Sequence, residues 1–240
     1  MKIAVAVKVV ADDQDIAVAG DRSLDYSKAK PVISTYDKNA IEAAAQLAAA
    51  TGGVADVISA AAADYDAKTK KDILSRGVEE LKVATGLPET ADSYATAQAL
   101  KGLCEGYDLI VTGEGSADFY AGQVNVQLAA ALGYPVINEV TGIEAADGKV
   151  IVKRTLDSEV QTVEVPLPAV VSVSPAIVEA RIPGMRDILK AGKKPSSAAD
   201  VAVETKVSYD EILAPVAADR KNQIFDDVEA FAAAVAEALK

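Results

Sequence analysis

The sequence predicts an α/β fold with a doubly wound, mostly parallel sheet, and three observations support this prediction. Apolar runs over residues 1–10, 54–61 and 108–112 are typical of strands buried inside a parallel sheet. Alanine-rich stretches with helical spacing lie between these runs. Strand and helix therefore alternate over residues 1–135, which indicates a sheet with helices on both faces. Sheets of this kind bind ligands at the carboxyl ends of their strands.

The expected helices carry start and stop signals. Asp37 is expected to cap a helix that continues through Ala50 and stops at the glycine pair beginning with Gly52. A second helix is expected over residues 66–76 and a third over residues 91–105. These helices complete the alternation with the strands.

After Pro135 the pattern changes to that of hairpins. Strand-like segments cover residues 136–140, 149–155, 160–165 and 169–173. The pairs Asp147-Gly148 and Asp157-Ser158 between them are turn signals. Because apolar and charged residues alternate here, one face of the hairpin is expected to be wet, so we predict an excursion from the main sheet.

The C-terminal part differs in composition from the rest of the chain. From Lys193 onward it is rich in Lys, Pro, Ser and Ala, and a last helical pattern follows over residues 225–239. One stripe of this helix holds its larger apolar side chains, Phe225, Val228, Phe231, Val235 and Leu239. We expect an α/β domain over residues 1–192 and a C-terminal arm over residues 193–240. The stripe needs a surface to pack on, either on its own domain or on a partner.

Charge and hydropathy exclude some partners. The net charge of −12 makes nucleic-acid phosphate a poor partner. No apolar run is long enough to span a membrane, and residues 1–10 resemble a buried strand more than a signal peptide. We expect a cytoplasmic protein that binds neither nucleic acid nor membrane.

Histidine is absent and Cys104 is the only cysteine. These absences exclude Ser-His-Asp and Cys-His hydrolases, histidine-ligated zinc and facial-triad iron within this chain. Carboxylate chemistry, lysine chemistry and a bound cofactor are left, and we favour the cofactor. We therefore assign no catalytic residue and no metal ligand.

The segment that most suggests a binding site is residues 108–131, where a buried strand leads through a small-residue loop into a helix. Gly113, Gly115 and Ser116 let backbone amides approach a ligand closely. The helix, expected to start near Ala121, offers N–H groups and its positive dipole end to a diphosphate. Because the spacing matches neither GxGxxG nor the Walker motif, an ordinary tight crossover is the alternative.

Three other segments are open to two interpretations each. Lys8 interrupts the first apolar run, so its ammonium is expected to meet either a ligand phosphate or flavin edge, or a carboxylate of the protein. Residues 34–42 form a polar helix entry for which capping by Asp37 suffices without a ligand. Residues 180–195 place Met185 beside a Pro-Gly pair, which favours partner docking, whereas a methionine folded into the core is the commoner case.

Six segments occur along the chain in the order MKIAVAVKVVADDQDIAV, ISTYDKNAIEAA, DILSRGVEELKVA, DLIVTGEGSADFYAGQV, PLPAVVSVS and IPGMRDILKAGKKP. Together they resemble the beta subunit of electron-transfer flavoproteins, and most closely the Fix-type branch associated with carnitine and acyl-CoA metabolism. The resemblance spans nearly the whole chain. Several matches in the same order are more specific than any one of them.

This resemblance implies a Rossmann-like domain of the adenine-nucleotide-binding type, joined to an alpha subunit that holds most of the electron-carrying FAD. The nucleotide of the beta subunit is AMP in ordinary members and a second FAD in electron-bifurcating members. The Gln123-Val124 pair is similar to the FAD-bearing group, but residues 118–121 depart from that group's Asp-Gly-Asp-Thr run. Both nucleotides stay open, with a slight preference for FAD. The arm is expected to pack on the alpha subunit.

The resemblance also assigns site residues. Those assigned to the nucleotide are Ala6, Val7, Lys8, Asn39, Gly113, Gly115, Ser116, Asp118, Ala121, Gly122, Gln123 and Val124. The phosphates are expected on the amides of residues 113–123, and the adenine near Ala6 and the strand that begins at Val54. Residues 183–189 match the family's recognition loop, which inserts an apolar residue into a dehydrogenase pocket. Its docking residues here are Pro183, Met185 and Leu189.

On this resemblance the chain shuttles electrons between an acyl-CoA dehydrogenase-type partner or NADH and a redox acceptor, and the flavin does the chemistry. With two FAD, the pair of subunits would bifurcate electrons. The alternative is a stand-alone, stress-type nucleotide-binding protein of the same fold, which would not need the arm. An ATP-cleaving ligase of that fold would need an SGGxDS-type loop, which residues 7–13 lack.

Overall fold

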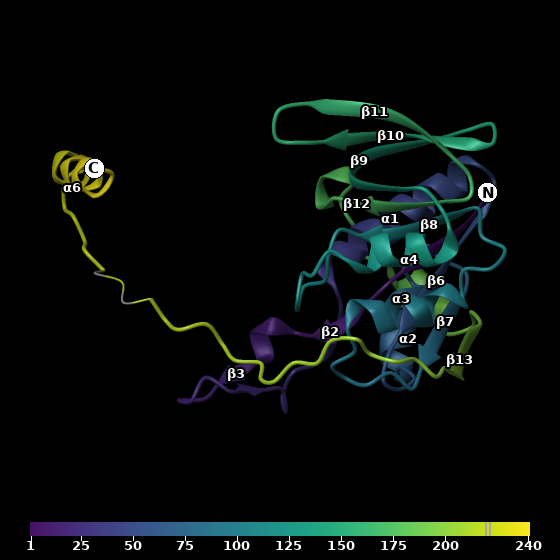
Figure 1. Ribbon diagram of the computed structural model, residues 1–240, viewed down its shortest axis with the longest axis horizontal. Helices are drawn as coiled ribbons and strands as arrows, with labels where there is room; N and C mark the ends of the chain where they lie inside the picture. The colour runs from purple at the N-terminus through teal and green to yellow at the C-terminus, as the bar shows by residue number, and fades with distance from the viewer. Residues whose placement is uncertain (219, 221) are drawn as a thin grey trace.

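The computed structural model describes residues 1–218, 220 and 222–240, and its centre is a nine-stranded sheet (Figure 1). In spatial order the strands are β11 (Val160–Pro166), β10 (Lys149–Thr155), β9 (Val136–Ala146), β12 (Ala169–Val173), β8 (Leu109–Gly113), β1 (Lys2–Ala6), β6 (Val54–Ala60), β7 (Leu81–Thr85) and β13 (Ser196–Asp200). Neighbouring strands pair in parallel from β9 to β13, whereas β9, β10 and β11 pair antiparallel. The predicted doubly wound, mostly parallel sheet with a hairpin excursion is confirmed.

Helices cover both faces of the sheet. The described chain forms α1 (Thr35–Ala50), α2 (Ala67–Leu74), α3 (Ser93–Lys101), α4 (Val124–Leu132), α5 (Met185–Ala191) and, away from the sheet (Figure 1), α6 (Val228–Ala238), with 3-10 turns η1 (Asp13–Asp15) and η2 (Pro175–Ile177). Alternate residues of β1 serve opposite faces, as the strand period requires. Ile3 and Val5 pack with α1 and α2 in one apolar cluster, and Ala4 packs with α3 and α4 in another.

The first apolar run divides where Lys8 interrupts it. β1 ends at Ala6, and β2 (Val9–Ala11) pairs outside the main sheet with β5 (Pro31–Ile33). The N–H of Lys8 donates to the Asp37 side chain instead of to a neighbouring strand. A second small hairpin pairs β3 (Ala17–Val18) with β4 (Leu24–Asp25). The sequence pattern predicted the run but not this division.

The last strand of the sheet comes from the C-terminal part of the chain. β13 was not predicted, and it extends the sheet by pairing in parallel with β7. Its five side chains are all exposed, so it has no apolar pattern that would have revealed it. The division at residue 192 between the domain and the arm therefore stays a prediction, although β13 lies beyond it.

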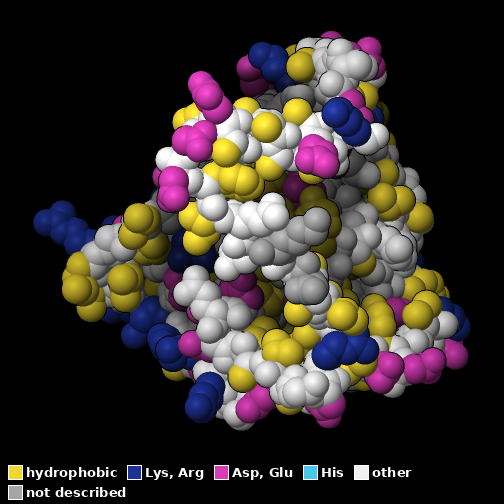
Figure 2. All heavy atoms as spheres, turned by 90° about the vertical axis from the view of Figure 1, so that its left-hand side faces the viewer, with side chains coloured by type: hydrophobic (Ala, Val, Ile, Leu, Met, Phe, Trp, Pro, Cys, Tyr) yellow, Lys and Arg dark blue, Asp and Glu magenta, His cyan; other side chains and the backbone are white. Residues whose placement is uncertain are grey.

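The C-terminal helix was predicted, and α6 falls inside residues 225–239. It lies away from the sheet at the end of an extended segment (Figure 1), and none of its residues is buried. Figure 2 views the molecule from the side of the arm and shows hydrophobic side chains spread over this face among charged ones. In the described chain the apolar stripe of α6 thus has no surface of its own domain to cover it. Among the described residues, no helix combines the length and apolar character needed to cross a bilayer.

Candidate functional site

The carboxyl ends of β1 and β8 lie side by side and form the centre of the candidate site. The two strands are parallel neighbours, with Ala6 opposite Thr112. The chain leaves them at Val7 and at Gly113, so the Lys8 region and the glycine loop meet at one edge of the sheet. This meeting point is the place predicted for a ligand in a doubly wound fold.

Lys8 forms an ion pair with the glycine loop. Its Nζ lies 2.5 Å from Oδ2 of Asp118. The protein carboxylate expected in one of the two interpretations of Lys8 is therefore present. Contact with a ligand phosphate or flavin stays a prediction.

Asp37 does not cap α1, so this expectation was wrong. The N-cap is Ser34, and Asp37 lies inside the first turn with its side chain buried. Its Oδ2 accepts the N–H of Lys8 at 2.7 Å, and its carboxyl also accepts the N–H of Gly113. Burial raises the pKa of Asp37 to about 7, although both hydrogen bonds favour the charged form. Asp37 therefore ties the ends of β1 and β8 to the start of α1.

The glycines of the loop are required by the protein's own packing. A Cβ added at Gly113 would lie 2.6 Å from Oδ1 of Asp37, and one added at Gly115 would collide with the Tyr120 ring. Gly122 has a φ of +62°, a backbone conformation that favours glycine. Close approach to a ligand is thus not needed to explain these glycines, and their role at a nucleotide stays a prediction.

Asp118 occupies a set of hydrogen-bond donors at the centre of the loop. Besides Lys8, its carboxylate accepts the hydroxyl of Ser116 at 2.5 Å and the N–H of Phe119 at 2.8 Å. Burial opposes the charged form, but the hydrogen bonds from Lys8 and Ser116 outweigh it and lower the pKa of Asp118. Asp118 is therefore ionised at neutral pH.

Helix α4 begins three residues later than expected, at Val124 instead of Ala121. Its N-cap residue Gln123 makes no side-chain cap hydrogen bond. The first N–H groups of a helix lack intrahelical partners, and together with the helix dipole they attract anions. Contact of Gly122, Gln123 and Val124 with a ligand phosphate stays a prediction.

Four aromatic residues around the loop were missed by the sequence analysis. The rings of Tyr36 and Tyr120 lie 5.0 Å apart, and those of Phe119 and Tyr209 stack at 5.2 Å. The Nζ of Lys8 lies 5.3 Å from the centre of the Phe119 ring. Only 5% of the chain is aromatic, so the adjacent pair Phe119-Tyr120 in a glycine loop was the available signal.

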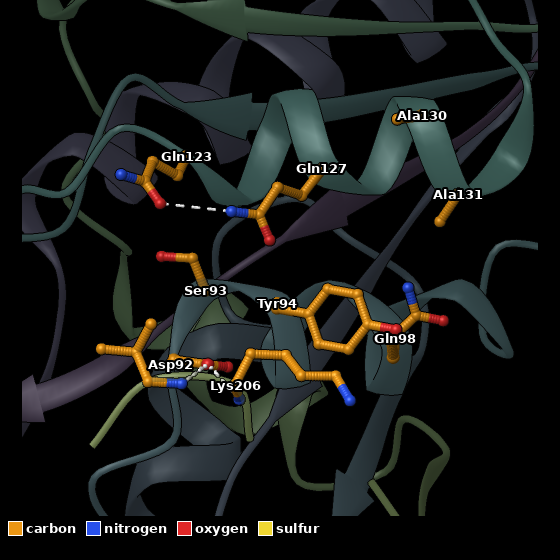
Figure 3. Close-up of a pocket in the computed structure, with 10 residues that line it drawn as sticks. Asp92, Ser93, Tyr94, Gln98, Gln123, Gln127, Ala130, Ala131 and Lys206 are labelled. Atoms are coloured by element: carbon orange, nitrogen blue, oxygen red, sulfur yellow. Dashed lines mark hydrogen bonds between the residues drawn. The ribbon is translucent and has the colours of Figure 1, made fainter. Parts of the chain in front are cut away.

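A groove of about 400 Å³ lies beside the loop, between α3, α4 and the arm (Figure 3). Tyr94, Gln123, Gln127 and Lys206 are among the residues that line it. Gln127 donates to Oε1 of Gln123 at 3.2 Å, and its own Oε1 is buried without a partner in the described chain. Of the predicted nucleotide residues, only Gln123 lines this groove.

Asn39 has a structural partner in the segment after η2. Its Nδ2 donates to the carbonyl of Val178 at 2.7 Å and so holds the segment after η2 against α1. Ala6 and Val7 are buried at the end of β1. The predicted roles of these three residues at a nucleotide stay predictions.

The predicted docking segment exposes apolar side chains and is tied to α1 by an ion pair. Met185 starts α5 and is 73% exposed, and Leu189 is exposed on the same helix, while Pro183 precedes it. The guanidinium of Arg181 holds both carboxylate oxygens of the buried Glu42, at 2.5 and 3.0 Å. Met185 is therefore displayed on the first turn of a helix, not on a loop as expected.

One comparison with known proteins identifies the family. A family model described as the electron transfer flavoprotein domain matches residues 23–204. The match runs from β4 through β13 and includes the glycine loop and the docking segment, and it ends before Lys206 and Val207 of the groove. Because it covers well over half of the chain, this protein belongs to the electron transfer flavoprotein family.

Proposed function

We propose that the chain is the beta-type subunit of a heterodimeric electron-transfer flavoprotein of the Fix-type branch. In this role it binds an adenine nucleotide, FAD or AMP, and works with an alpha subunit that carries the electron-transferring FAD. The complex passes electrons between an acyl-CoA dehydrogenase-type partner or NADH and a redox acceptor, in acyl-CoA or carnitine metabolism. The family membership is the basis on which this finer assignment rests.

The observation that carries nucleotide binding is the donor set at the carboxyl ends of β1 and β8. The Lys8 ammonium and the Ser116 hydroxyl meet at Asp118 in the glycine loop, and the same loop leads into the uncapped first turn of α4. Ammonium, hydroxyl and backbone N–H groups are the donors that phosphate oxygens accept from. The residues present thus fit the phosphate groups that FAD and AMP share.

The role of this chain is binding and positioning. Bound FAD supplies the redox chemistry. Lys8 and the amides of residues 113–123 would hold the phosphates, while Asp37 keeps the two strand ends in place beneath them. No protein acid or base is needed for this function.

The need for a partner subunit is supported by the exposed apolar side chains. Val228 on α6 is 80% exposed and Phe231 is 53% exposed, on a helix that buries none of its residues. Large apolar side chains gathered on one stripe mark an interaction surface. We assign this surface to the alpha subunit, and Met185 and Leu189 to a redox partner.

The decisive experiment is to co-express the chain with a candidate alpha subunit, purify the complex, denature it and quantify the released FAD and AMP. Two FAD and no AMP per heterodimer would assign the chain to the electron-bifurcating group. One FAD with one AMP would make it an ordinary carrier. The absence of both a complex and a nucleotide would contradict the proposal.

A matched pair of variants locates the nucleotide. Lys8→Met removes the ammonium from the loop, and we expect the complex to lose the nucleotide of this chain while keeping the FAD of the alpha subunit. Lys149→Met is the control, because Lys149 is also paired with a carboxylate, 2.6 Å from Glu164, but on the distant β10–β11 hairpin. Equal nucleotide content in both variants would show that Lys8 does not bind the nucleotide.

A further inference from the structure

The C-terminal arm is fastened to the domain before it reaches α6. Oδ2 of Asp92 accepts the N–H groups of Lys206 and Val207 at 2.6 and 2.7 Å, while Oδ1 caps α3 through Ala95. Further along, the N–H of Ala214 donates to the carbonyl of Arg22 at 2.9 Å. The arm is thus held on both sides of the segment between residues 207 and 214.

Between these two attachments the arm touches the glycine loop. Tyr209 stacks on Phe119 with the ring planes at 24°. Phe119 directly follows Asp118, and its N–H donates to the Asp118 carboxylate. The Lys8 ammonium lies over the Phe119 ring. A single aromatic contact therefore joins the arm to the residue that supports the Asp118 carboxylate.

The Asp118 carboxylate is held as a phosphate would be. It accepts from an ammonium, a hydroxyl and a backbone N–H, which are the three kinds of donor that bind phosphate oxygens. A nucleotide phosphate that uses Lys8 and Ser116 has to displace this carboxylate, and it also meets its negative charge. The loop is thus satisfied by an anion of its own.

We propose that the arm is a latch on the nucleotide loop: the Tyr209–Phe119 contact keeps Asp118 in the phosphate-binding donor set, and removal of the arm by the partner subunit frees the loop for nucleotide. The inference rests on the proposed function, because it concerns the same loop. The coupling is reciprocal, so bound nucleotide also loosens the arm. Nucleotide affinity is therefore low in the free chain and rises when the arm is taken up.

The test compares variants of the full-length chain without an alpha subunit, titrated with AMP in a calorimeter. Tyr209→Ala removes the contact at a side chain that is already 42% exposed, so the fold is not at risk. We expect AMP affinity to rise about two- to tenfold, the range that one aromatic pair accounts for. Phe225→Ala is the control, because this aromatic residue lies on the same arm but packs with Phe231. Asp118→Asn should raise the affinity as well, because it removes the competing charge.

Hydrogen exchange separates a failed latch from a failed function. Without any nucleotide, Tyr209→Ala should speed exchange at the amide of Phe119, and added AMP should speed exchange at the amides of Lys206 and Val207. Unchanged exchange at Phe119, or an AMP affinity that stays the same or falls in Tyr209→Ala, would overturn the latch. If no free-chain variant binds AMP, the titration contradicts the latch, because freeing the loop should raise the affinity; the nucleotide released from the co-expressed complex then decides the proposed function separately.

Discussion

Helices α1 and α6 are both rich in alanine, yet α1 is largely buried and α6 is not. α1 packs against β1, β6 and β8, and nine of its sixteen residues are buried. α6 buries none of its eleven residues, although its stripe carries larger apolar side chains. Apolar content alone therefore does not place a helix in the core. A helix is placed by the surface that the rest of the chain offers, and for α6 that surface is missing from the described residues.

The largest effect is expected in the core of α1. Ile41 is 1% exposed and packs in the main apolar cluster. Ile41→Ala should lower the free energy of unfolding by about 2–5 kcal/mol, because it removes buried methyl groups and leaves a cavity. Urea unfolding of the free chain measures this loss. Val228→Ala on α6 is the control, and a loss as large as that of Ile41→Ala would mean that α6 is packed in the free chain.

The second effect concerns the buried carboxyl of Asp37 in the first turn of α1. Because the folded pKa of Asp37 is raised to about 7 from 3.8, the folded chain binds more protons than the unfolded chain between these values. The stability that protonated Asp37 contributes is complete below pH 3.8 and is lost as the pH rises through 7. Asp37→Asn should therefore lose less stability than the wild type between pH 5 and pH 8, by on the order of 2 kcal/mol. Parallel pH profiles of the two proteins in urea unfolding would contradict this.

The exposed stripe of α6 is expected to matter for binding and not for folding. Phe231→Ala should change the stability of the free chain by less than about 0.5 kcal/mol, because the ring is exposed on α6. It should weaken binding to the alpha subunit by at least about tenfold if Phe231 is an aromatic anchor of that interface. Surface plasmon resonance with an immobilised alpha subunit measures the affinity. Glu237→Gln is the control, because it also changes a side chain of α6 but leaves the helix intact.

The smallest effect is expected where α1 holds the docking segment. The side chain of Arg181 is 40% exposed, so its ion pair with Glu42 is partly screened, and Arg181→Ala should cost about 1 kcal/mol. Burial opposes ionisation of Glu42, but the hydrogen bonds from Arg181 and Gln46 lower its pKa. The contribution is thus present above the unfolded pKa of 4.5 and is lost as the pH falls through the folded pKa.

Unfolding at pH 7 and pH 3 checks this last prediction. The difference between wild type and Arg181→Ala should shrink in acid. Arg186→Ala, which removes an exposed arginine of α5, provides the control. A difference that is equal at both pH values would show that the arginine acts through packing alone.

Much of the fold was predictable because its signals are local. Buried strands such as β8 are continuous apolar runs, and the turn before β10 is marked by Asp147-Gly148. β13 gave no such signal, since it is defined by pairing with β7 and not by its own side chains. A strand of this kind is visible only when its neighbour is known.

The candidate site was predictable in its position but not in its contacts. The strand-loop-helix pattern indicated where a ligand would bind. The contact of Lys8 with Asp118 joins residues 110 positions apart, and the sequence offered it only as one of two alternatives. Aspartate is a common N-cap residue, and Asp37 lies near the start of α1. Its carboxylate instead accepts the N–H groups of Lys8 and Gly113, which are distant in the sequence. The stack of Tyr209 on Phe119 has no sequence signature at all.

Strand β11 lies at the outer edge of the nine-stranded sheet. An edge strand offers unpaired N–H and C=O groups to other chains and can start polymerisation. β11 carries Glu164, which is paired with Lys149 on β10, and it ends at Pro166, which has no N–H to donate. Charge and proline are features that keep edge strands from pairing edge to edge with other chains. The β11 edge is thus protected from pairing with a second copy of the chain.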